Sequence, residues 1–387
     1  MPQAKERGLR FTRGRLENWR NFTGVETDLQ KRVFLVGPNA SGKSNFLDAF
    51  RFLRDIAAIG GGFSEAVRRR GGVSKIRALA ARREPAIVLV VQLGNDDNAQ
   101  MWTYELAFIQ DNRRRPVIKR ERVAKDGAVI MDRPDDKDTA DPERLTQTYL
   151  EQVYANQEFH EVADFFASVQ YLHLIPQLVR EPDRWIVRKN DPYGGDLLER
   201  IARTPERTRQ AWLRRISEAV RLAVPQLAAL ELWRDPASGS PHLRGKYAHW
   251  RPRGAWQNEE QFSDGTLRLI GLLWALFDGS GPLLLEEPEL SLHPEVIRHI
   301  PQMLARLQRK HNRQVVISTH SFEILQDEGI GLDEVLVLQP GHEGTTLVLA
   351  RDLEQVQALL RGGIGLGEAV MPLTRPEDAK QLPLFAE

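Results

Sequence analysis

The stretch that decides the fold runs from Gln261 to Pro294 and reads QFSDGTLRLIGLLWALFDGSGPLLLEEPELSLHP. It begins with a small polar turn, Ser263-Asp264-Gly265-Thr266, which opens a helix that is apolar on nearly all sides through Phe277. A helix that begins with Ser and Gly presents free backbone N–H groups and the positive end of its dipole. The turn is therefore a candidate phosphate-binding site.

The same stretch continues with an apolar run, Pro282 to Leu285, followed directly by Glu286 and Glu287. Such a run predicts a buried strand of a parallel sheet. The two carboxylates then emerge at the carboxyl end of that strand, where open α/β sheets bind their ligands. One carboxylate suits a metal-binding role and the other the activation of a water molecule. Taken alone, the stretch also has a simpler interpretation, a capped helix followed by acidic loop residues.

The composition is that of an ordinary soluble protein. The 387 residues are 41% hydrophobic and 28% charged, and the formal net charge of +1 argues neither for nor against a nucleic-acid partner. No segment reaches the roughly 20 apolar residues of a membrane span, and the N-terminus lacks the apolar core of a secretory signal. Because cysteine is absent, disulfides and thiolate sites are excluded. We expect a cytoplasmic protein of two lobes or domains.

A second motif lies near the N-terminus. Val33 to Val36 predicts a short buried strand that leads into Gly37-Pro38-Asn39-Ala40-Ser41-Gly42-Lys43-Ser44, and a helical pattern follows to Ile59. This segment matches G-x-x-x-x-G-K-[ST] between a strand and a helix. Gly37 and Gly42 let the backbone curl so that its N–H groups point at phosphate. Lys43 neutralises the β- and γ-phosphates, and the Ser44 hydroxyl can bind Mg²⁺.

The segments between the two motifs indicate a β-meander followed by helices. Polar links separate strand-like runs at residues 86–93, 101–109, 117–123 and 128–131, which predicts an antiparallel meander after an early hairpin at Arg10 to Thr27. Residues 132–142 predict an exposed loop, and residues 143–169 and 197–230 predict helices. The Arg-rich segment has two interpretations, a solvated basic helix or a strip that faces a polyanion. Its arginines are Arg68, Arg69, Arg70, Arg77, Arg82 and Arg83.

Beyond Pro294 the pattern returns to helix and strand. Glu295 to His311 predicts one amphipathic helix. Gln314 to Ser321 predicts another buried strand, with His320 just past its end. Val335–Leu338 and Thr345–Leu349 predict a last strand pair, and the tail shows only weak helical patterning.

In this order, the motifs resemble the head of ATP-binding-cassette (ABC) ATPases, in the branch that includes RecF and SMC proteins. More closely, GPNASGKSNFLDAFRFLRD, FSDGTLRLIGLL and LLLEEPELSLHP resemble bacterial AAA-family ATPases of the AAA_21-like group, which are related to overcoming-lysogenization-defect proteins. The resemblance extends over nearly the whole chain, although residues 95–255 follow it only loosely. It implies an α/β P-loop NTPase of ABC/SMC-head type, with a mixed sheet, an antiparallel β lobe and a helical lobe. The implied single head, residues 1–387, consists of an N-terminal part (1–94), the inserted lobes (95–260), the SDGT-to-His320 part (261–350) and a tail (351–387).

The resemblance assigns a role to each motif residue. Lys43 and Ser44 correspond to the Walker A residues for phosphate and Mg²⁺. Glu286 corresponds to the Walker B acid on the metal side, Glu287 to the acid that polarises the attacking water, and His320 to the switch histidine that senses the γ-phosphate. The loop that couples the two sites of a dimer corresponds to Ser291–Pro294. The signature turn, which reaches the ATP of the second protomer, corresponds to Ser263, Gly265 and Thr266. The other implied ATP-binding residues lie in or directly after the P-loop and are Gly37, Asn39, Ala40, Ser41, Gly42 and Asn45.

Some positions depart from the family pattern. Glu286 stands where many relatives carry Asp, although its longer side chain still presents a carboxylate, and Thr266 stands where transporters usually have glycine. No motif marks the glutamine that reports on Mg²⁺. Gln177, at the end of a strand-to-loop run, is our choice, with Gln170 and Gln92 as alternatives. The histidines show no metal-ligand spacing, so we expect no separate metal site.

These roles imply an ATPase that uses ATP and Mg²⁺ and that forms a homodimer joined by ATP, with a conformational switch as its output. Our preferred hypothesis is the ATPase component of a prokaryotic anti-phage defence or DNA-surveillance system, which controls an effector nuclease or toxin encoded separately. The alternative is a RecF-like repair ATPase that binds DNA through its arginine-rich segments, including Arg113–Arg115. Intact Lys43, Glu287 and His320 disfavour a non-enzymatic regulator, and the SDGT turn disfavours a transporter ATPase.

Overall fold

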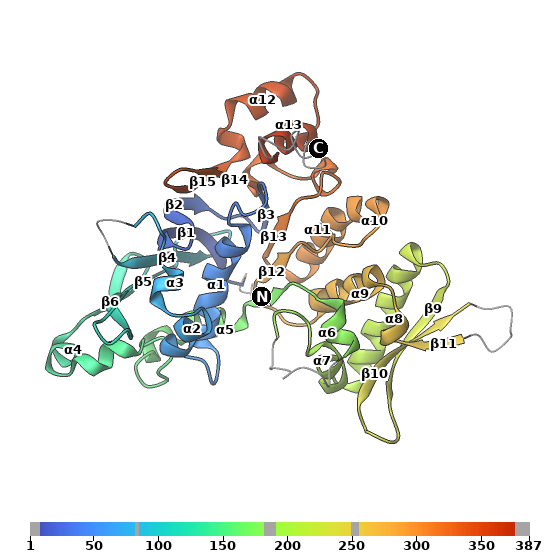
Figure 1. The fold of residues 1–387 in the computed structure, drawn as a ribbon, viewed down its shortest axis with the longest axis horizontal. Helices are drawn as coiled ribbons and strands as arrows, with labels where there is room; N and C mark the ends of the chain where they lie inside the picture. Colours follow the sequence, from blue (N-terminus) through green and yellow to red (C-terminus); the bar gives the residue numbers. More distant parts are fainter. Residues whose placement is uncertain (1–7, 82–84, 182–190, 249–254, 376–387) are drawn as a thin grey trace, which may run out of the picture. The chain divides into compact units, whose positions relative to one another are not determined.

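A computed structural model describes residues 8–81, 85–181, 191–248 and 255–375. The chain forms two compact units (Figure 1), which are described separately here. Unit 1 consists of Met1–Val169, Ser280–Leu284 and Pro301–Glu387, and unit 2 consists of Gln170–Gly279 and Leu285–Ile300.

The first sheet of unit 1 is built around two short strands, β3 (Arg32–Val36) and β13 (Val315–Thr319), that are buried along their whole length. β3 pairs in parallel with β13 and with β14 (Val335–Gly341), which in turn pairs antiparallel with β15 (Gly344–Leu349). β12 (Leu283–Glu286) completes the order β15-β14-β3-β13-β12. Every residue of β3 and β13 is buried, as the apolar runs predicted. β12 continues into unit 2, where its neighbour is β8 (Gln170–Leu172).

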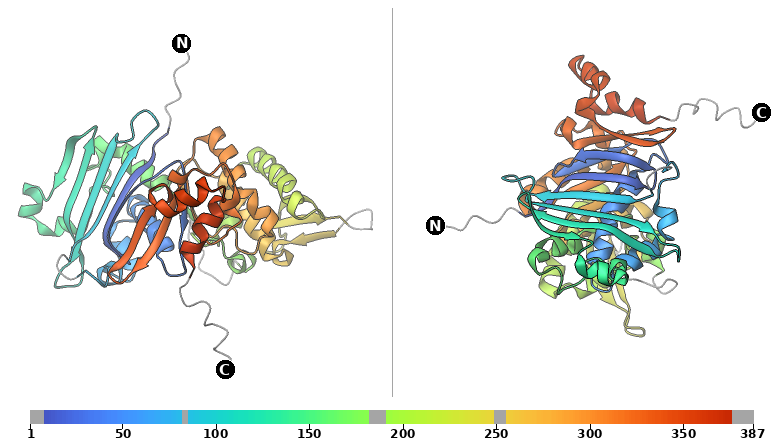
Figure 2. Two further views of the ribbon diagram at one scale, coloured as in Figure 1. Left: turned by 90° about the horizontal axis from the view of Figure 1, so that it is seen from above. Right: turned by 90° about the vertical axis from the view of Figure 1, so that its left-hand side faces the viewer.

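The second sheet of unit 1 is the predicted antiparallel meander, and Figure 2 shows its strands side by side. The early hairpin joins the meander in one six-stranded sheet with the order β2-β1-β4-β5-β6-β7. Alternate residues of β1 and β4 are buried, which is typical of a sheet with one packed face. The strands are β1 (Arg10–Trp19), β2 (Phe22–Asp28), β4 (Ile87–Gly94), β5 (Trp102–Gln110), β6 (Pro116–Lys125) and β7 (Ala128–Arg133).

An aromatic core joins this sheet to the helix that follows the P-loop, α1 (Lys43–Ala57). The ring centroids of Phe11 and Phe50 lie 4.7 Å apart, and those of Phe52 and Phe108 lie 5.7 Å apart. All four rings are buried, so the hydrophobic effect fixes α1 against the sheet. The other helices of unit 1 are α2 (Phe63–Arg69), α3 (Val73–Ile76), α4 (Asp136–Ala140), α5 (His160–Ser168), α12 (Glu354–Arg361) and α13 (Leu366–Val370).

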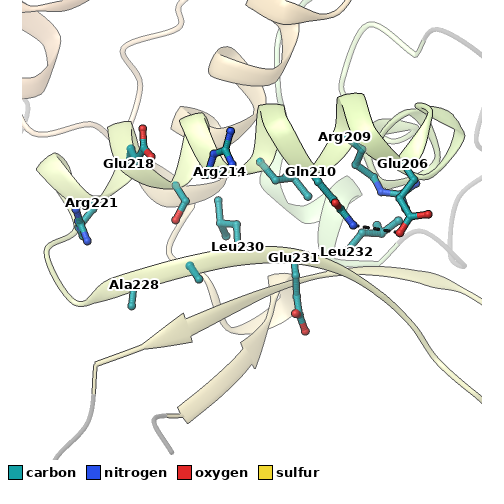
Figure 3. Close-up of a pocket in the computed structure, with 13 residues that line it drawn as sticks. Glu206, Arg209, Gln210, Arg214, Glu218, Arg221, Ala228, Leu230, Glu231 and Leu232 are labelled. Carbon is teal, nitrogen blue, oxygen red and sulfur yellow. Dashed lines mark hydrogen bonds between the residues drawn. The ribbon is translucent and has the colours of Figure 1, made fainter.

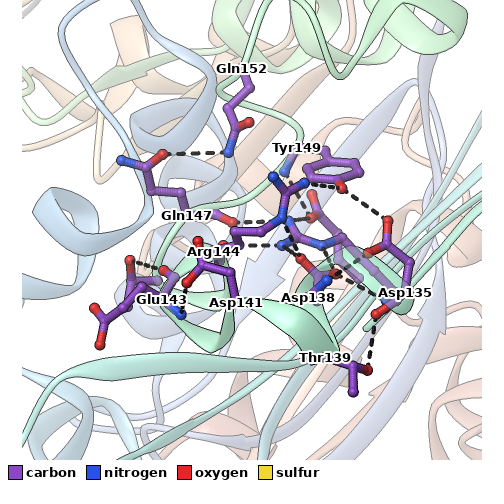
Figure 4. A network of polar contacts seen from close by, with 12 residues as sticks. Asp135, Asp138, Thr139, Asp141, Glu143, Arg144, Gln147, Tyr149 and Gln152 are labelled. Atoms are coloured by element: carbon purple, nitrogen blue, oxygen red, sulfur yellow. Dashed lines mark hydrogen bonds and ion pairs between the residues drawn. The ribbon is translucent and has the colours of Figure 1, made fainter.

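The segment predicted as an exposed loop, residues 132–142, is mostly exposed, but it contains α4 and places two charged side chains, Arg133 and Asp138, in a buried network (Figure 4). The Arg133 guanidinium is fully buried and pairs with Asp138 at 2.7 Å and with Glu121 at 3.2 Å. Burial raises the pKa of Glu121. Burial also acts to raise the pKa of Asp138, but the hydrogen bonds from Arg133, the Asp135 N–H and Arg144, together with the charge of Arg133, outweigh it and hold that pKa at about 2. The acidic composition of the segment suggests that it is exposed. Arg133 and Asp138 are buried because each has a charged partner, and the partner Glu121 comes from another strand.

The predicted helix over 143–169 is confirmed only in its second half. α5 begins at His160, whereas Pro142–Thr146 and Gln157–Phe159 form short 3₁₀ helices with turns between them. The buried Glu121 carboxylate accepts hydrogen bonds from the backbone N–H groups of Tyr149 and Leu150, at 2.8 and 3.2 Å. These N–H groups are therefore committed to a side chain and not to a helical ladder.

Unit 2 combines helices with a three-stranded antiparallel sheet in the order β11-β10-β9. The two predicted helices of 197–230 are present, but the second ends at Ala223 and the last predicted residues belong to β9. The apolar helix after the SDGT turn packs on α8, where the rings of Trp212 and Trp274 lie 5.2 Å apart. The elements are α6 (Pro176–Arg180), α7 (Leu197–Arg203), α8 (Glu206–Ala223), β9 (Leu227–Arg234), β10 (Pro241–Tyr247), β11 (Ala255–Asn258), α9 (Asp264–Phe277) and α10 (Pro294–Arg298).

The single helix predicted over Glu295–His311 is instead two helices, α10 and α11 (Ile300–His311), separated at His299. Pro301 accounts for the break, because proline lacks the N–H that would donate to the Ile297 carbonyl oxygen and its ring would clash with that carbonyl in a continuous helix. None of the helices in the described part of the chain is both long and apolar enough to span a membrane.

Removal of the central cation should show how far the charge network stabilises unit 1. Arg133→Met leaves the buried Glu121 without its counterion and Asp138 with only the partly exposed Arg144, so we expect the free energy of unfolding to fall by about 3–5 kcal/mol. Arg120→Met on the neighbouring strand removes a pair with Asp132 whose side chains are 43% and 40% exposed, and it should cost at most about 1 kcal/mol. Urea unfolding of both variants measures the difference, and equal losses would contradict a special role for the buried network.

Glu151 should make the stability of unit 1 depend on pH. Its burial raises its pKa from the ordinary 4.5 to about 7, although it accepts a hydrogen bond from the Phe63 N–H. Between these two pH values the folded chain holds a proton that the unfolded chain has lost, so this group's contribution to stability falls as the pH rises. Glu151→Gln should therefore become more stable relative to the parent from pH 4.5 to pH 7, with a constant difference above that. Melting temperatures across this range test it, with the exposed Glu158→Gln as control.

Candidate functional site

The P-loop lies between β3 and α1 and presents an uncapped helix terminus. Gly42 precedes the helix with φ of 101°, a left-handed conformation that favours glycine. A side chain at this position would also collide with Asn21. Gly42, at the N-cap position, has no side chain with which to cap α1, and the first turn of this helix contains no acidic residue. Since an uncapped N-terminus attracts an anion, the local structure suits a phosphate group.

The other P-loop residues differ in exposure. Asn39, Ala40 and Ser44 are exposed, and Ala40 has a positive φ of 61°. Lys43 is buried, and its Nζ donates hydrogen bonds to the carbonyl oxygens of Gly37 and Pro38 at 2.9 and 3.0 Å. The ammonium thus lies over its own loop, where it can exchange these carbonyls for phosphate oxygens.

His320 lies at the same sheet edge as the P-loop. Thr319, the last residue of β13, is paired in register with Val36, the last residue of β3. Parallel strands end at one edge, so the residues that follow, Gly37 and His320, leave the sheet side by side. The His320 side chain is partly exposed there. The strand register, and not sequence distance, brings the predicted switch histidine to the P-loop.

In unit 2, Glu286 and Glu287 stand where the chain leaves β12. The Tyr171 hydroxyl donates a hydrogen bond to Glu286 Oε2, and His173 Nδ1 lies 3.3 Å from the Glu286 carbonyl oxygen. Glu287 has a positive φ of 44°, which is uncommon for a residue with a side chain. The backbone therefore turns sharply after Glu286, so the two carboxylates do not simply follow the alternation of a strand.

The signature turn caps its own helix. Ser263 Oγ accepts a hydrogen bond from the Thr266 N–H at 3.2 Å and lies 2.8 Å from Thr266 Oγ1. A Cβ at Gly265 would collide with the Ser291 carbonyl oxygen, so the signature turn lies directly against the Ser291–Pro294 loop. Capping is the simpler role that the sequence also allowed, and it does not prevent a phosphate contact, because Ser263 Oγ keeps further hydrogen-bonding capacity.

Two residues near Glu286 were not predicted from the sequence. Tyr171 and His173 contact it from β8 and its end, whereas the side chain of Gln177, our predicted metal-side glutamine, is exposed on α6. The two residues are separated by one position, which places them on one face of the strand. That spacing was visible in the sequence, but nothing in it indicated that this strand lies beside β12.

Arg268, on the first turns of α9, is a further charged group near these carboxylates. Its burial lowers its pKa, and the charges of Asp264, Glu287 and Glu289 oppose that shift. Asp264 also pairs with Arg180 at 2.6 Å. Arg268 thus offsets part of the negative charge of Glu287 and Glu289, the carboxylates that follow β12.

Two other features of unit 2 do not coincide with these motifs. An open groove of about 580 Å³ lies between α8 and β9 (Figure 3), and none of the motif residues lines it. His242, Glu259 and Glu260 lie close enough together to suggest a metal site. However, Glu259 Oε1 lies 2.8 Å from His242 Nδ1 and Oε2 accepts the Leu243 N–H at 2.8 Å, so this carboxylate already joins β10 to the segment before the signature turn.

Several arginines of the arginine-rich segments form ion pairs with carboxylates of the chain itself. Arg82 and Arg83 lie outside the described residues. Of the others, the paired arginines are Arg68 and Arg69 with Glu65, Arg70 with Asp48 and Asp55, and Arg115 with Asp111 and Glu143. These pairs weaken the interpretation of the segments as a strip that faces a polyanion.

Comparison with known proteins relates this geometry to two groups. Two methionine import ATP-binding proteins MetN match part of the chain. The protein from Leifsonia xyli subsp. xyli is 32% identical over 87 residues, 22% of this chain and 25% of the relative. The protein from Burkholderia thailandensis is 29% identical over 126 residues, 32% of this chain and 36% of the relative. The chain thus spans only about a quarter to a third of these relatives.

The fold is similar to that of solved SMC heads. The SmcHead bound to the C-winged helix domain of ScpA has a TM-score of 0.54 at 14% identity, covering 87% of this chain and 96% of that chain. The Smc head domain bound to the C-terminal domain of ScpA derived from Pyrococcus furiosus has a TM-score of 0.50 at 13% identity, covering 91% and 100%. A family model matches residues 32–326, well over half of the chain. The chain therefore belongs to the family described as "AAA domain, putative AbiEii toxin, Type IV TA system", and it is an ATPase of the ABC/SMC type.

Proposed function

We propose that this ATPase is a molecular switch whose two heads dimerise around ATP. The observation that carries the proposal is the uncapped N-terminus of α1, with the Lys43 ammonium held over the P-loop. It supports binding of the ATP phosphates at Gly37–Ser44, with Asn45 beginning the helix. The hydroxyl of Ser44 and the carboxylate of Glu286 are hard oxygen ligands that fit Mg²⁺, which would neutralise charge on the phosphates. Gln177 remains a predicted metal-side residue.

The chemistry proposed for the site is transfer of the γ-phosphoryl group to water. Glu287 orients and polarises the attacking water, and His320 contacts the γ-phosphate. Ser263, Gly265 and Thr266 reach the ATP held by the second protomer. Contact between the signature turn and the Ser291–Pro294 loop supports this assignment, because nucleotide at the turn would also shift that loop.

Tyr171 acts in this scheme as a positioning residue. Its hydroxyl donates a hydrogen bond to Glu286 Oε2 and so restricts the rotamers of a side chain that is longer than aspartate. A carboxylate offers about four acceptor sites, so this hydrogen bond does not prevent Glu286 from binding a metal ion. Thus the departure from aspartate at this position is compensated by a neighbour on β8.

The biological role that we infer is the ATPase component of a prokaryotic anti-phage defence or DNA-surveillance system, with a separately encoded nuclease or toxin as its effector. The description of the family, which names a toxin and a type IV toxin–antitoxin system, supports this role. A RecF-like ATPase that grips DNA through its arginine-rich segments has less support, because Arg70 and Arg115 are paired within the chain.

The ATP-dependent dimer can be tested without disturbing the helix cap. In a Glu287→Gln background, ATP with Mg²⁺ should double the molecular mass measured by light scattering. Ser263→Asp caps a helix as well as serine does, but its charge repels the γ-phosphate of the partner's ATP, so this variant should stay monomeric with an unchanged melting temperature. Ser263→Asn is the neutral control that keeps the cap. Dimerisation of Ser263→Asp at the parent's ATP concentration, or a fixed oligomer that ignores ATP, would refute the proposal.

Loss of the Tyr171 hydroxyl should weaken the binding of Mg²⁺ at the proposed site and leave folding intact. For Tyr171→Phe we expect the Mg²⁺ concentration for half-maximal ATPase activity to rise by about tenfold, since a hydrogen bond to a charged group is lost. ATPase rates over a Mg²⁺ titration provide the measurement. Tyr154→Phe, at a residue that is 90% exposed, is the matched control. An unchanged Mg²⁺ dependence in Tyr171→Phe would remove the positioning role.

A further inference from the structure

We propose that Asn21 and Thr345 position the P-loop for ATP, which makes the C-terminal hairpin β14–β15 part of the nucleotide-binding machinery. Neither residue belongs to a nucleotide motif, and they lie far from each other in the sequence. The proposal rests on the nucleotide role of the P-loop given above. The two side chains and the carbonyl that they hold are called the Ser41 clamp.

The Ser41 clamp is a closed set of hydrogen bonds. Asn21 lies in the turn between β1 and β2, and its Nδ2 donates to the Ser41 carbonyl oxygen and to Thr345 Oγ1, both at 2.7 Å. Thr345 Oγ1 donates to the same Ser41 carbonyl oxygen at 2.9 Å. Asn21 Oδ1 accepts from Asn45 Nδ2 at 2.8 Å. The polar atoms of the Asn21 side chain thus form hydrogen bonds with the P-loop, α1 and β15.

Backbone contacts fix the clamp itself. The Thr345 N–H donates to the Asn21 carbonyl oxygen at 2.9 Å, which joins β15 to the β1–β2 turn. Thr345 is 5% exposed and Ser41 is fully buried, so these hydrogen bonds do not compete with bulk water. The clamp is therefore a rigid support and not a surface contact.

The glycines of the P-loop lie against the same support. A Cβ at Gly42 would collide with the Asn21 side chain, and a Cβ at Gly37 would lie 2.8 Å from the Leu338 carbonyl oxygen on β14. Both glycines are thus needed for close approach of this support as well as for the curl of the loop. The hairpin and the β1–β2 turn together form the floor on which the loop lies.

The clamp determines the direction of a phosphate-binding N–H group. The peptide between Ser41 and Gly42 is planar and trans, so its C=O and N–H point in opposite directions. With the Ser41 carbonyl held by Asn21 and Thr345, the Gly42 N–H is directed to the other side of that peptide plane, away from the clamp. Loss of the clamp would let the peptide rotate, and part of the binding free energy of phosphate would then be spent on reordering it. The expected effect is on ATP affinity and not on the chemical step.

Substitutions at the two clamp positions should separate affinity from turnover. Asn21→Ala and Thr345→Val should raise the Kd and KM for ATP by about tenfold, with kcat within about threefold of the parent. Thr345→Ser keeps the hydroxyl that Thr345→Val removes, so its affinity for ATP should equal that of the parent. Thr346→Val is the matched control, because Thr346 is the exposed neighbour on β15 and its hydroxyl contacts only the Gln339 carbonyl in the described residues. Calorimetric titration with ATP, steady-state kinetics and melting temperatures are the measurements.

The outcomes distinguish failure of the clamp from failure of the P-loop assignment. If Lys43→Ala binds ATP normally, the P-loop role itself is wrong. If Lys43→Ala abolishes binding but Thr345→Val leaves Kd unchanged, the clamp proposal is overturned. It is also overturned if Thr345→Val and Thr345→Ser weaken binding equally, or if kcat falls while Kd and KM do not change. Should Asn21→Ala fail to fold, the Thr345 pair still decides the question.

Discussion

The nucleotide motifs depend on one interaction, the parallel pairing of β3 with β13. These strands are buried throughout, and Val36 lies opposite Thr319 at their carboxyl ends. Exposed residues begin only where the buried strands end, so the P-loop and His320 emerge together at one edge. A shift of the register by one residue would turn every strand side chain to the opposite face and separate the two motifs.

The helices that follow the P-loop and the SDGT turn begin in different ways. α1 begins after a glycine and has no side-chain cap, whereas α9 is capped by Ser263. The first terminus therefore suits permanent phosphate binding, and the second is already stabilised within the protomer. This difference agrees with the proposed ATP-dependent dimer, in which the P-loop binds nucleotide first and the signature turn is engaged only when a second head arrives.

The sequence was least informative where buried charge replaces apolar packing. Residues 132–142 look like a solvated acidic loop, yet Arg133 and Asp138 are buried because Glu121, on another strand, completes the network. Hydrophobic periodicity carries no information about such partners. The break at His299 is a different case, because Pro301 was visible in the sequence. The prediction of a single helix followed the amphipathic pattern and neglected this proline.

The sequence by itself determined the elements whose signal is local. Apolar runs, glycines and capping residues within a few positions of one another predict three kinds of element. These are the P-loop, the buried strands that lead to Gly37, Glu286 and His320, and the helix after the SDGT turn. Only the tertiary structure decided which side chains support them. Tyr171 and His173 reach Glu286 because β8 lies beside β12, and Asn21 and Thr345 meet at the Ser41 carbonyl although the chain separates them widely. Strand order and register bring such residues together, and both are set by the packing of the whole unit, which no local pattern encodes.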